Sequence, residues 1–245
     1  MKAMILAAGE GTRLRPLTLT TPKPMLPVRD CPTLEWIVGW LRSHGVRDLI
    51  VNLYHLPEVI EDYFGDGSRC GVTLAYSREE TLLGTAGALD RVASQLTDDF
   101  LVVYGDVLTD LDVSALLACH EAHRVAGAPH ITLSLNQAPN PWDCGVVAVD
   151  DDWRVTRFVE KPPRDQIFSP WTNAGVLVLP AMALAAIDTV PSDISRHLLP
   201  RLLAQGVPCY GWPLPADTYL LDMGSSTGPV TEIRRPVAFV ASSVA

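Results

Sequence analysis

The chain has 245 residues, of which 48% are hydrophobic and 19% are charged, and its formal net charge is −9. This length suits one large α/β domain better than two small ones, and the composition is that of an ordinary globular protein. The acidic balance argues against a nucleic-acid-binding surface, which is normally basic. It is compatible with a local basic pocket for a phosphorylated small molecule.

The cysteines and the apolar stretches indicate where the protein works. The five cysteines are scattered and odd in number, with no Cys-x-x-Cys pair, so neither a disulfide framework nor a zinc site is expected and a reducing compartment fits best. The apolar run at 2–8 is too short for the core of a signal peptide. The run at 176–187 is too short to span a bilayer and contains Pro180. We therefore expect a cytoplasmic protein with no membrane partner.

Apolar runs and helical patterns alternate through the first half of the chain. We predict strands at 3–8, 48–53, 72–76, 100–104 and 131–135. We predict helices between them at 34–42, 57–64, 84–96 and 113–124. This rhythm implies right-handed crossovers and a parallel sheet flanked by helices, so the predicted fold class is α/β.

The second half of the chain is less regular. We predict strands at 145–149, 155–160 and 176–179, a helix at 193–204, and loops at 140–142 and 162–171. Periodicity is lost from residue 234, so 234–245 is expected to be a loose tail.

A glycine loop with two cations follows the first predicted strand. Gly9 and Gly11 come directly after it, Arg13 follows, and Lys23 stands between two prolines. Glycines let backbone N–H groups approach an anion, arginine grips a phosphate with two hydrogen bonds, and lysine adds a point charge. The spacing is not that of a Walker A loop, and Leu14 stands where a dinucleotide fingerprint has its third glycine. We interpret the loop as a polyphosphate site; the alternative is a tight turn with surface cations.

Small residues open the helix predicted from residue 84. The stretch Gly84-Thr85-Ala86-Gly87 would let a flat group, such as the edge of a nucleobase, approach the backbone. The alternative is a helix start whose small residues only allow tight packing. The residues by themselves leave both readings open.

Asp106 follows Gly105 at the carboxyl end of a buried strand, where open α/β sheets bind their ligands. A carboxylate beside a polyphosphate is a natural ligand for Mg²⁺, which takes one or two carboxylates and phosphate oxygens. The alternative is that Asp106 caps the next helix, but Asp110 and Asp112 are better placed for that role.

Three further motifs in the second half carry polar groups. Glu160 and Lys161 end a predicted strand before a proline, where they can turn toward a sugar hydroxyl and a phosphate; the alternative is a solvated charge pair. Asn173 precedes another strand, and its amide can both donate to and accept from a hydroxyl. Asp222 stands before a glycine turn and, with Asp106, would complete a two-carboxylate metal site.

Together these residues resemble the sugar-1-phosphate nucleotidylyltransferases, also called NDP-sugar pyrophosphorylases. The motifs follow the family's order: Leu6-Ala7-Ala8-Gly9-x-Gly11-Thr12-Arg13-Leu14, Pro22-Lys23-Pro24, Gly84-Thr85-Ala86-Gly87, Gly105-Asp106, Glu160-Lys161-Pro162, Asn173-Ala174-Gly175 and Asp222-x-Gly224. The resemblance implies a Rossmann-like, mostly parallel sheet flanked by helices, of the nucleotide-diphospho-sugar transferase type. It also implies an Mg²⁺-dependent enzyme.

The resemblance assigns a role to each matching position. Catalytic roles fall to Arg13, Lys23 and Lys161. Nucleotide-binding roles fall to Leu6, Ala8, Gly9, Gly11, Thr12, Glu79, Gly84 and Thr85. Sugar-binding roles fall to Gly145, Glu160 and Asn173. Asp106 and Asp222 would hold Mg²⁺, with Asp222 the less typical of the two because Met223-Gly224-Ser225 follows it where the family often has Ile-Gly-Thr.

The resemblance also divides the chain. It implies a nucleotidyltransferase domain over 1–233, with a nucleotide-binding half at about 1–130 and a sugar-binding half at about 131–233, and a tail at 234–245. Glu79 and the glycine-loop motif look most like the mannose-1-phosphate guanylyltransferases. Members of that branch commonly carry a C-terminal β-helix, for which we expect this chain to be too short.

The expected substrates are GTP and mannose 1-phosphate, or a related manno-configured sugar such as a heptose. Alternatives in the same class are uridylyl, thymidylyl or cytidylyl transfer to glucose or to an N-acetylated sugar 1-phosphate. From a different class, the alternative is a non-catalytic regulatory subunit that binds nucleotide sugars. Neither nucleic acid nor a membrane is an expected partner, and a homo-oligomer is left open.

Overall fold

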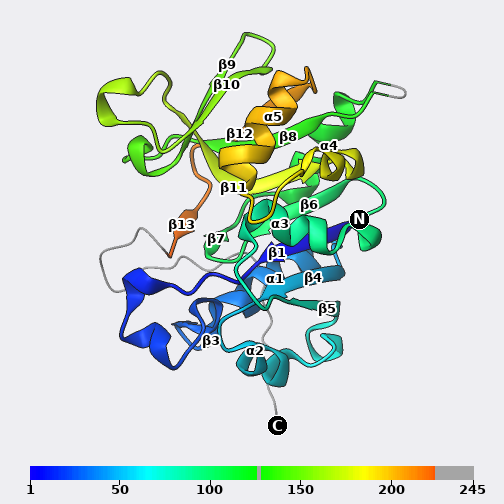
Figure 1. Ribbon diagram of the computed structural model, residues 1–245, viewed down its shortest axis with the longest axis vertical. Helices are drawn as coiled ribbons and strands as arrows, with labels where there is room; N and C mark the ends of the chain where they lie inside the picture. Colours follow the sequence, from blue (N-terminus) through cyan, green and yellow to red (C-terminus); the bar gives the residue numbers. More distant parts are fainter. Residues whose placement is uncertain (126–127, 224–245) are drawn as a thin grey trace.

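The computed structural model describes residues 1–125 and 128–223, and Figure 1 shows its arrangement. Within these residues a nine-stranded sheet has the strand order β10-β9-β11-β6-β1-β4-β5, with β8 paired to β11 and β12 paired to β8. The strand order places β1 in the middle of the parallel part, so the first motif of the chain emerges at the centre of the sheet.

The parallel part of the sheet consists of four strands, three of them largely buried and the fourth, β5, at the edge of the sheet. They are β1 (Lys2–Leu6), β4 (Asp48–Leu53), β5 (Thr73–Arg78) and β6 (Phe100–Tyr104). Ile5 pairs with Val51 on one side and with Val103 on the other, and all three side chains are fully buried. Strands covered on both faces need continuous apolar runs, which is why the sequence identified them.

The second part of the sheet is largely antiparallel. It contains β8 (Ile131–Asn136), β9 (Gly145–Val149), β10 (Val155–Glu160), β11 (Trp171–Leu179) and β12 (Cys209–Pro213). The long strand β11 runs antiparallel to β6, β8 and β9 and so joins the two parts. The strand predicted at 131–135 therefore runs in the same direction as β6 but is separated from it by β11.

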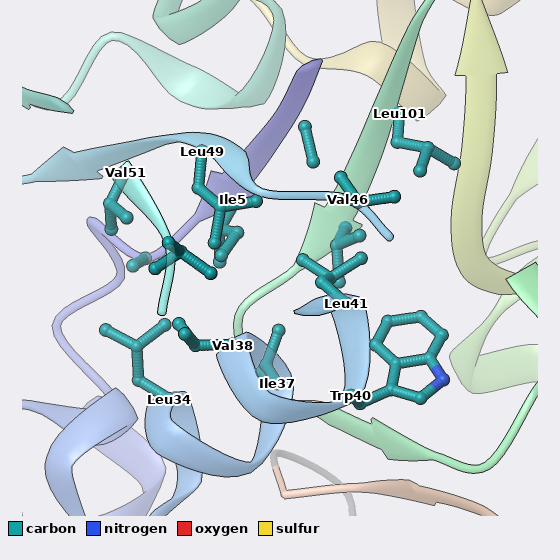
Figure 2. Close-up of a cluster of buried hydrophobic side chains, with 14 of the residues drawn as sticks. Ile5, Leu34, Ile37, Val38, Trp40, Leu41, Val46, Leu49, Val51 and Leu101 are labelled. Atoms are coloured by element: carbon teal, nitrogen blue, oxygen red, sulfur yellow. The ribbon is translucent and has the colours of Figure 1, made fainter. Parts of the chain in front are cut away.

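Helices cover both faces of the sheet. One face carries α1 (Thr33–Ser43), α2 (Pro57–Phe64) and α4 (Val113–Ala122), and the other carries α3 (Gly84–Arg91) and α5 (Leu199–Ala204). A hydrophobic core lies on each face of the sheet, and alternate residues of β1 contribute to the two cores. Ile5 packs toward α1, and Met4 packs toward α3. Figure 2 shows the α1 side, where Leu34, Ile37, Val38 and Leu41 meet the strands.

Two small sheets and several short turns complete the described chain. The small sheets pair β2 (Pro27–Val28) with β3 (Cys31–Pro32), and β7 (Val107–Thr109) with β13 (Leu220–Asp222). Single turns of 3₁₀ helix occur at Thr12–Leu14, Leu17–Leu19, Lys23–Met25, Ser68–Cys70, Ala93–Gln95, Pro141–Asp143 and Arg164–Gln166, and a longer one at Ala181–Ala186.

The α/β prediction is confirmed, and three elements differ from their predicted bounds by more than two residues. The helix predicted at 84–96 ends at Arg91 and is followed by a separate 3₁₀ turn. The helix predicted at 193–204 is a π-helix over Ile194–Leu198 followed by α5, because Pro200 has no N–H to continue an α-helical ladder. The strand predicted at 176–179 begins five residues earlier, at Trp171, which the sequence placed at the end of the loop predicted at 162–171.

No helix among the described residues is long and apolar enough to cross a membrane. Gly224 and the predicted tail at 234–245 lie outside the described residues.

Candidate active site

Two cavities meet at the carboxyl ends of the central strands. The glycine-loop cavity, of about 370 Å³, lies over β1, β4 and the start of α3. The Glu160 cavity, of about 430 Å³, lies over β9, β10 and β11. Both are lined by Arg13, Thr85, Tyr104, Asp106 and Asp193. Ligands in the two cavities would therefore be in contact or close to it, with these five side chains at the boundary.

The glycine loop is a tight turn that leaves Arg13 exposed over the boundary. Gly11 has φ +62°, and a Cβ there would lie 2.9 Å from Thr18 Cγ2, so only glycine fits without strain. The Gly11 carbonyl accepts hydrogen bonds from Leu14 N at 2.8 Å and from the Thr18 hydroxyl at 2.9 Å. These contacts hold the turn closed while Arg13 reaches both cavities.

Lys23 and Asp106 form an ion pair beneath this loop. Lys23 begins a 3₁₀ turn between two prolines, and its side chain is only 11% exposed. Its ammonium group donates to Asp106 Oδ2. The close approach of Gly105 to β1 positions this carboxylate, because Gly105 N donates to Leu6 O at 2.9 Å and a Cβ on Gly105 would lie 2.7 Å from the same oxygen.

The second predicted metal ligand reaches the same place through the β7–β13 pair. Asp222 pairs with Val107, and Met223 N donates to Asp106 O at 2.9 Å. Asp106 and Asp222 both line the Glu160 cavity. Over residues 1–125 and 128–223 no group of three or more His, Cys, Asp or Glu side chains is arranged to hold a metal. Two hard carboxylates fit Mg²⁺, which takes its remaining ligands from phosphate and water.

A buried polar network supports the glycine-loop cavity from below. The Asn52 side chain accepts from Ala7 N at 2.7 Å and donates to Glu79 Oε1 at 2.8 Å. The other oxygen, Glu79 Oε2, accepts from Leu83 N at 2.9 Å. Asn52 and Glu79 are 4% and 7% exposed, so every atom of this network depends on its partners. The network joins the start of the glycine loop to the start of α3.

The start of α3 is covered by a turn from the second half of the chain. Gly84 has φ +75°, and a Cβ there would lie 2.4 Å from the carbonyl oxygen of Ser192. That carbonyl accepts from Ala86 N at 2.8 Å and from Gly87 N at 3.1 Å. The small residues therefore allow tight packing of residue 192, which was the alternative reading. Gly84 and Thr85 nevertheless line the glycine-loop cavity, as the first reading required.

The Glu160 cavity combines a buried carboxylate with a strained lysine. Burial raises the pKa of Glu160 above its ordinary value, and Lys161 and Arg196 oppose this rise. A Cβ on Gly145 would lie 2.9 Å from Glu160 Oε2, so the glycine leaves room for the carboxylate. Lys161 has φ +50°, which is unusual for a non-glycine residue, and its N donates to Cys144 O at 2.9 Å.

Asn173 lies beside a β-bulge in β11. Its side-chain oxygen accepts from Gly175 N at 3.1 Å, and Gly175 has φ +83°. The register of β11 against β8 shifts between Asn173 and Leu177, which turns the start of the strand toward the cavity.

Every predicted site residue lines one of the two cavities. Leu6, Ala8, Gly9, Gly11, Thr12, Lys23, Glu79 and Gly84 line the glycine-loop cavity. Gly145, Glu160, Lys161, Asn173 and Asp222 line the Glu160 cavity. Arg13, Thr85 and Asp106 line both. Residues predicted from motifs far apart in the chain thus meet at one edge of the sheet.

The sequence did not identify several other lining residues. These are Asn52, Tyr104, Asn136, Asp193, Ser195 and Arg196. Asn52 had a signal, since it is the polar residue inside an apolar strand at 48–53. Tyr104 directly precedes the Gly105-Asp106 motif, and burial raises its pKa to about 12. No sequence signal marked Asp193, because it lies at the start of a predicted helix, where aspartate is common.

The comparisons with known proteins assign the chain to a family. A family model described as "Nucleotidyl transferase" matches residues 2–214, so the chain belongs to that family. A UTP–glucose-1-phosphate uridylyltransferase of Synechocystis sp. is 39% identical over 226 residues, covering 86% of this chain and 57% of the relative. A mannose-1-phosphate guanylyltransferase of Mycobacterium tuberculosis is 38% identical, covering 91% of this chain and 61% of the relative. The predicted resemblance to sugar-1-phosphate nucleotidyltransferases is confirmed.

Solved structures share the fold. A Bacillus anthracis protein described as a glucose-1-phosphate thymidylyltransferase superposes with a TM-score of 0.79 at 22% identity, covering 91% of this chain and 90% of that one. HddC from Yersinia pseudotuberculosis, solved with GMP-PN, gives a TM-score of 0.73 at 22% identity, covering 91% and 93%. The Rossmann-like sheet of the nucleotide-diphospho-sugar transferase type is thereby confirmed.

Proposed function

We propose that the protein joins an NTP and a sugar 1-phosphate to give an NDP-sugar and pyrophosphate. The observation that carries this proposal is the pair of cavities with a shared boundary of Arg13, Asp106 and three further side chains. A reaction between two phosphorylated substrates needs two adjoining pockets with cations at the junction. The proposed division into a nucleotide-binding half at about 1–130 and a sugar-binding half at about 131–233 follows the same two cavities.

The proposed chemistry is a single in-line displacement at the α-phosphorus. A phosphate oxygen of the sugar 1-phosphate forms the new P–O bond, and the bond from the α-phosphorus to the bridging oxygen breaks, so that pyrophosphate leaves with the electron pair. No proton transfer and no covalent enzyme intermediate are needed. Catalysis then consists of positioning two anions and neutralising their charge.

Each cation has a proposed task in this step. Arg13 grips the phosphates that leave as pyrophosphate, since it projects from the glycine loop over the boundary. Lys23 stands beside Asp106 at the reacting phosphates and reduces their mutual repulsion. Lys161 binds the phosphate of the sugar, and Glu160 accepts a hydrogen bond from a sugar hydroxyl. Asn173 contributes a second contact to the hydroxyl groups.

Asp106 and Asp222 are the proposed holders of Mg²⁺, because they lie on paired segments and line one cavity. When bound, the ion would neutralise charge on the reacting phosphates.

We propose GTP as the nucleotide on the basis of Glu79. Its carboxylate can only accept hydrogen bonds, and two of its acceptor positions are used by Asn52 and Leu83. Its remaining acceptor positions suit a base with adjacent donors, and the Watson–Crick edge of guanine offers an N–H and an amino group. The Mycobacterium tuberculosis relative, named for guanylyl transfer to mannose 1-phosphate, supports mannose or a related manno-configured sugar such as a heptose.

Uridylyl transfer to glucose 1-phosphate is the second candidate, because the 39% identical Synechocystis relative carries that name. Thymidylyl or cytidylyl transfer, also to an N-acetylated sugar 1-phosphate, remains an alternative within the class. A non-catalytic regulatory subunit is disfavoured, since Arg13, Lys23 and Asp106 stand together in the cavity. The five cysteines are free thiols, which supports a cytoplasmic setting.

Pyrophosphate release tests the reaction. Five NTPs are crossed with mannose, heptose, glucose and N-acetylglucosamine 1-phosphates, with and without Mg²⁺, and GTP with a manno-configured sugar is expected to be fastest. Arg13→Ala and Asp106→Ala should lower kcat by a factor of about 10² or more. Arg15→Ala and Asp151→Ala are matched controls outside both cavities. Near-normal turnover in both cavity variants would refute the assignment.

A further inference from the structure

Residues 192–195 lead into the π-helix and include its first two residues; this 192–195 turn belongs to the second half of the chain but is hydrogen-bonded to the first. Ser192 N donates to Leu83 O at 2.8 Å, while Ser192 O accepts from Ala86 N and Gly87 N. In an isolated helix the first N–H groups have no partner and attract anions. Here the carbonyl of residue 192 accepts from two of them, Ala86 N and Gly87 N. The N–H groups at the start of α3 therefore bind this turn rather than a phosphate.

The Thr85 side chain locks the turn in place. Its hydroxyl accepts from Ile194 N at 2.8 Å and lies 3.3 Å from Asp193 Oδ1, to which it donates. The same carboxylate oxygen lies 3.5 Å from Thr85 N. The negative charge of Asp193 lies at the positive end of α3, where it is stabilising. One hydroxyl therefore connects a backbone amide and a carboxylate of the turn to the nucleotide side of the site.

The far end of the turn reaches the Glu160 cavity. The Ser195 hydroxyl lies 3.4 Å from the Tyr104 hydroxyl, and Ser195 lines the cavity together with Glu160. Asp193 itself lines both cavities, and so does Thr85. The path from α3 to Glu160 is four residues long, so any shift of the turn changes the distance between the two cavities.

We propose that the contact of the Thr85 hydroxyl with Asp193 and Ile194 is a positioning contact, which sets the alignment of the two substrates rather than the affinity for either one. This inference rests on the function proposed above. Alignment matters most in the transition state, because an in-line displacement requires the attacking oxygen to face the α-phosphorus. A displacement of about 1 Å can lower a rate about 10²-fold while each substrate keeps its own contacts.

Thr85→Val tests the proposal, because valine keeps the shape of threonine and removes the hydroxyl. We expect kcat to fall roughly 10- to 100-fold. The dissociation constants of an α,β-methylene GTP analogue and of mannose 1-phosphate, each measured alone by calorimetry, should change less than threefold. Thr85→Ser restores the hydroxyl and should recover most of the lost kcat. Asp188→Asn is the control, because Asp188 lies in the same segment between β11 and α5 but outside both cavities. Its kcat and both dissociation constants should match those of the wild type.

Two outcomes would overturn the inference: a kcat within twofold of the wild type, or an intact kcat with either dissociation constant raised tenfold or more. The second outcome would make Thr85 a binding group.

A separate readout distinguishes failure of this inference from failure of the proposed function. If the wild type releases no pyrophosphate from any substrate pair, the proposed function fails. Hydrogen exchange at the amides of Ala86 and Gly87 still tests whether Thr85 holds the 192–195 turn against α3, because both amides donate to Ser192 O. Thr85→Val should accelerate their exchange about tenfold. Unchanged exchange would refute the claim that the Thr85 hydroxyl holds the turn against α3.

Discussion

Replacing Asn52 by alanine should destabilise the protein and disturb the glycine loop together. The substitution leaves Ala7 N without its acceptor at 2.7 Å and Glu79 Oε1 without its donor at 2.8 Å. Each group is buried, and an unpaired buried polar group costs about 1–3 kcal/mol. The two groups together lower the free energy of unfolding by about 2–6 kcal/mol. For a chain of this size that corresponds to a decrease in Tm of roughly 4–24 °C.

Urea denaturation followed by tryptophan fluorescence measures this loss, and Asn140→Ala is the matched control. Asn140 is exposed, so its replacement should change the unfolding free energy by less than about 0.5 kcal/mol. A loss below about 0.5 kcal/mol in Asn52→Ala as well would refute the reasoning, because it would mean that neither partner needs the amide.

Asn52→Asp separates the two hydrogen bonds. The aspartate keeps an acceptor for Ala7 N but places a second carboxylate against Glu79. Like charges at this distance raise the pKa of one carboxyl, so the folded state binds more protons than the unfolded state. The variant should therefore be least stable at pH 8 and recover stability as the pH falls toward 5. The same pH profile in the wild type would contradict this account.

Two further predictions concern the edges of the site. Gly84→Ala should cost several kcal/mol, because the new Cβ would lie 2.4 Å from Ser192 O; Gly45→Ala has a similar φ of +79° with nothing within 4 Å, so the difference between their unfolding free energies measures the clash alone. Burial raises the pKa of Glu160 in the folded state. Above this raised pKa the buried carboxylate is ionised and lowers the free energy of unfolding, whereas below the ordinary carboxyl pKa it is protonated in both states and has no such effect. Glu160→Gln should therefore be more stable than the wild type at pH 8 but not at pH 4 in thermal melts, with a raised KM for the sugar 1-phosphate; lower stability at pH 8 would show that the carboxylate is stabilising.

The sequence predicted most of the elements that carry the site, because buried strands and amphipathic helices have strong periodic signals. The predicted bounds of β4, α2 and β6 agree with the structure. The strands β7, β12 and β13 were missed. They are short or contain Gly211 and Pro213, so they have no run of alternating residues, and they form only because a neighbouring strand offers its edge.

The residues by themselves determined which chemistry the chain can carry: a glycine loop with Arg13 and Lys23, a carboxylate at the end of a strand, and a Glu-Lys pair before a proline. Only the tertiary structure showed that the α3 start both packs tightly against Ser192 and lines the glycine-loop cavity, and that Asn52 and Asp193 line the cavities as well. The physical reason is that local patterns report burial and turn geometry, whereas Ser192 reaches Gly84 across more than a hundred residues. Such a contact depends on how the antiparallel part of the sheet packs against α3, and no local pattern encodes that packing.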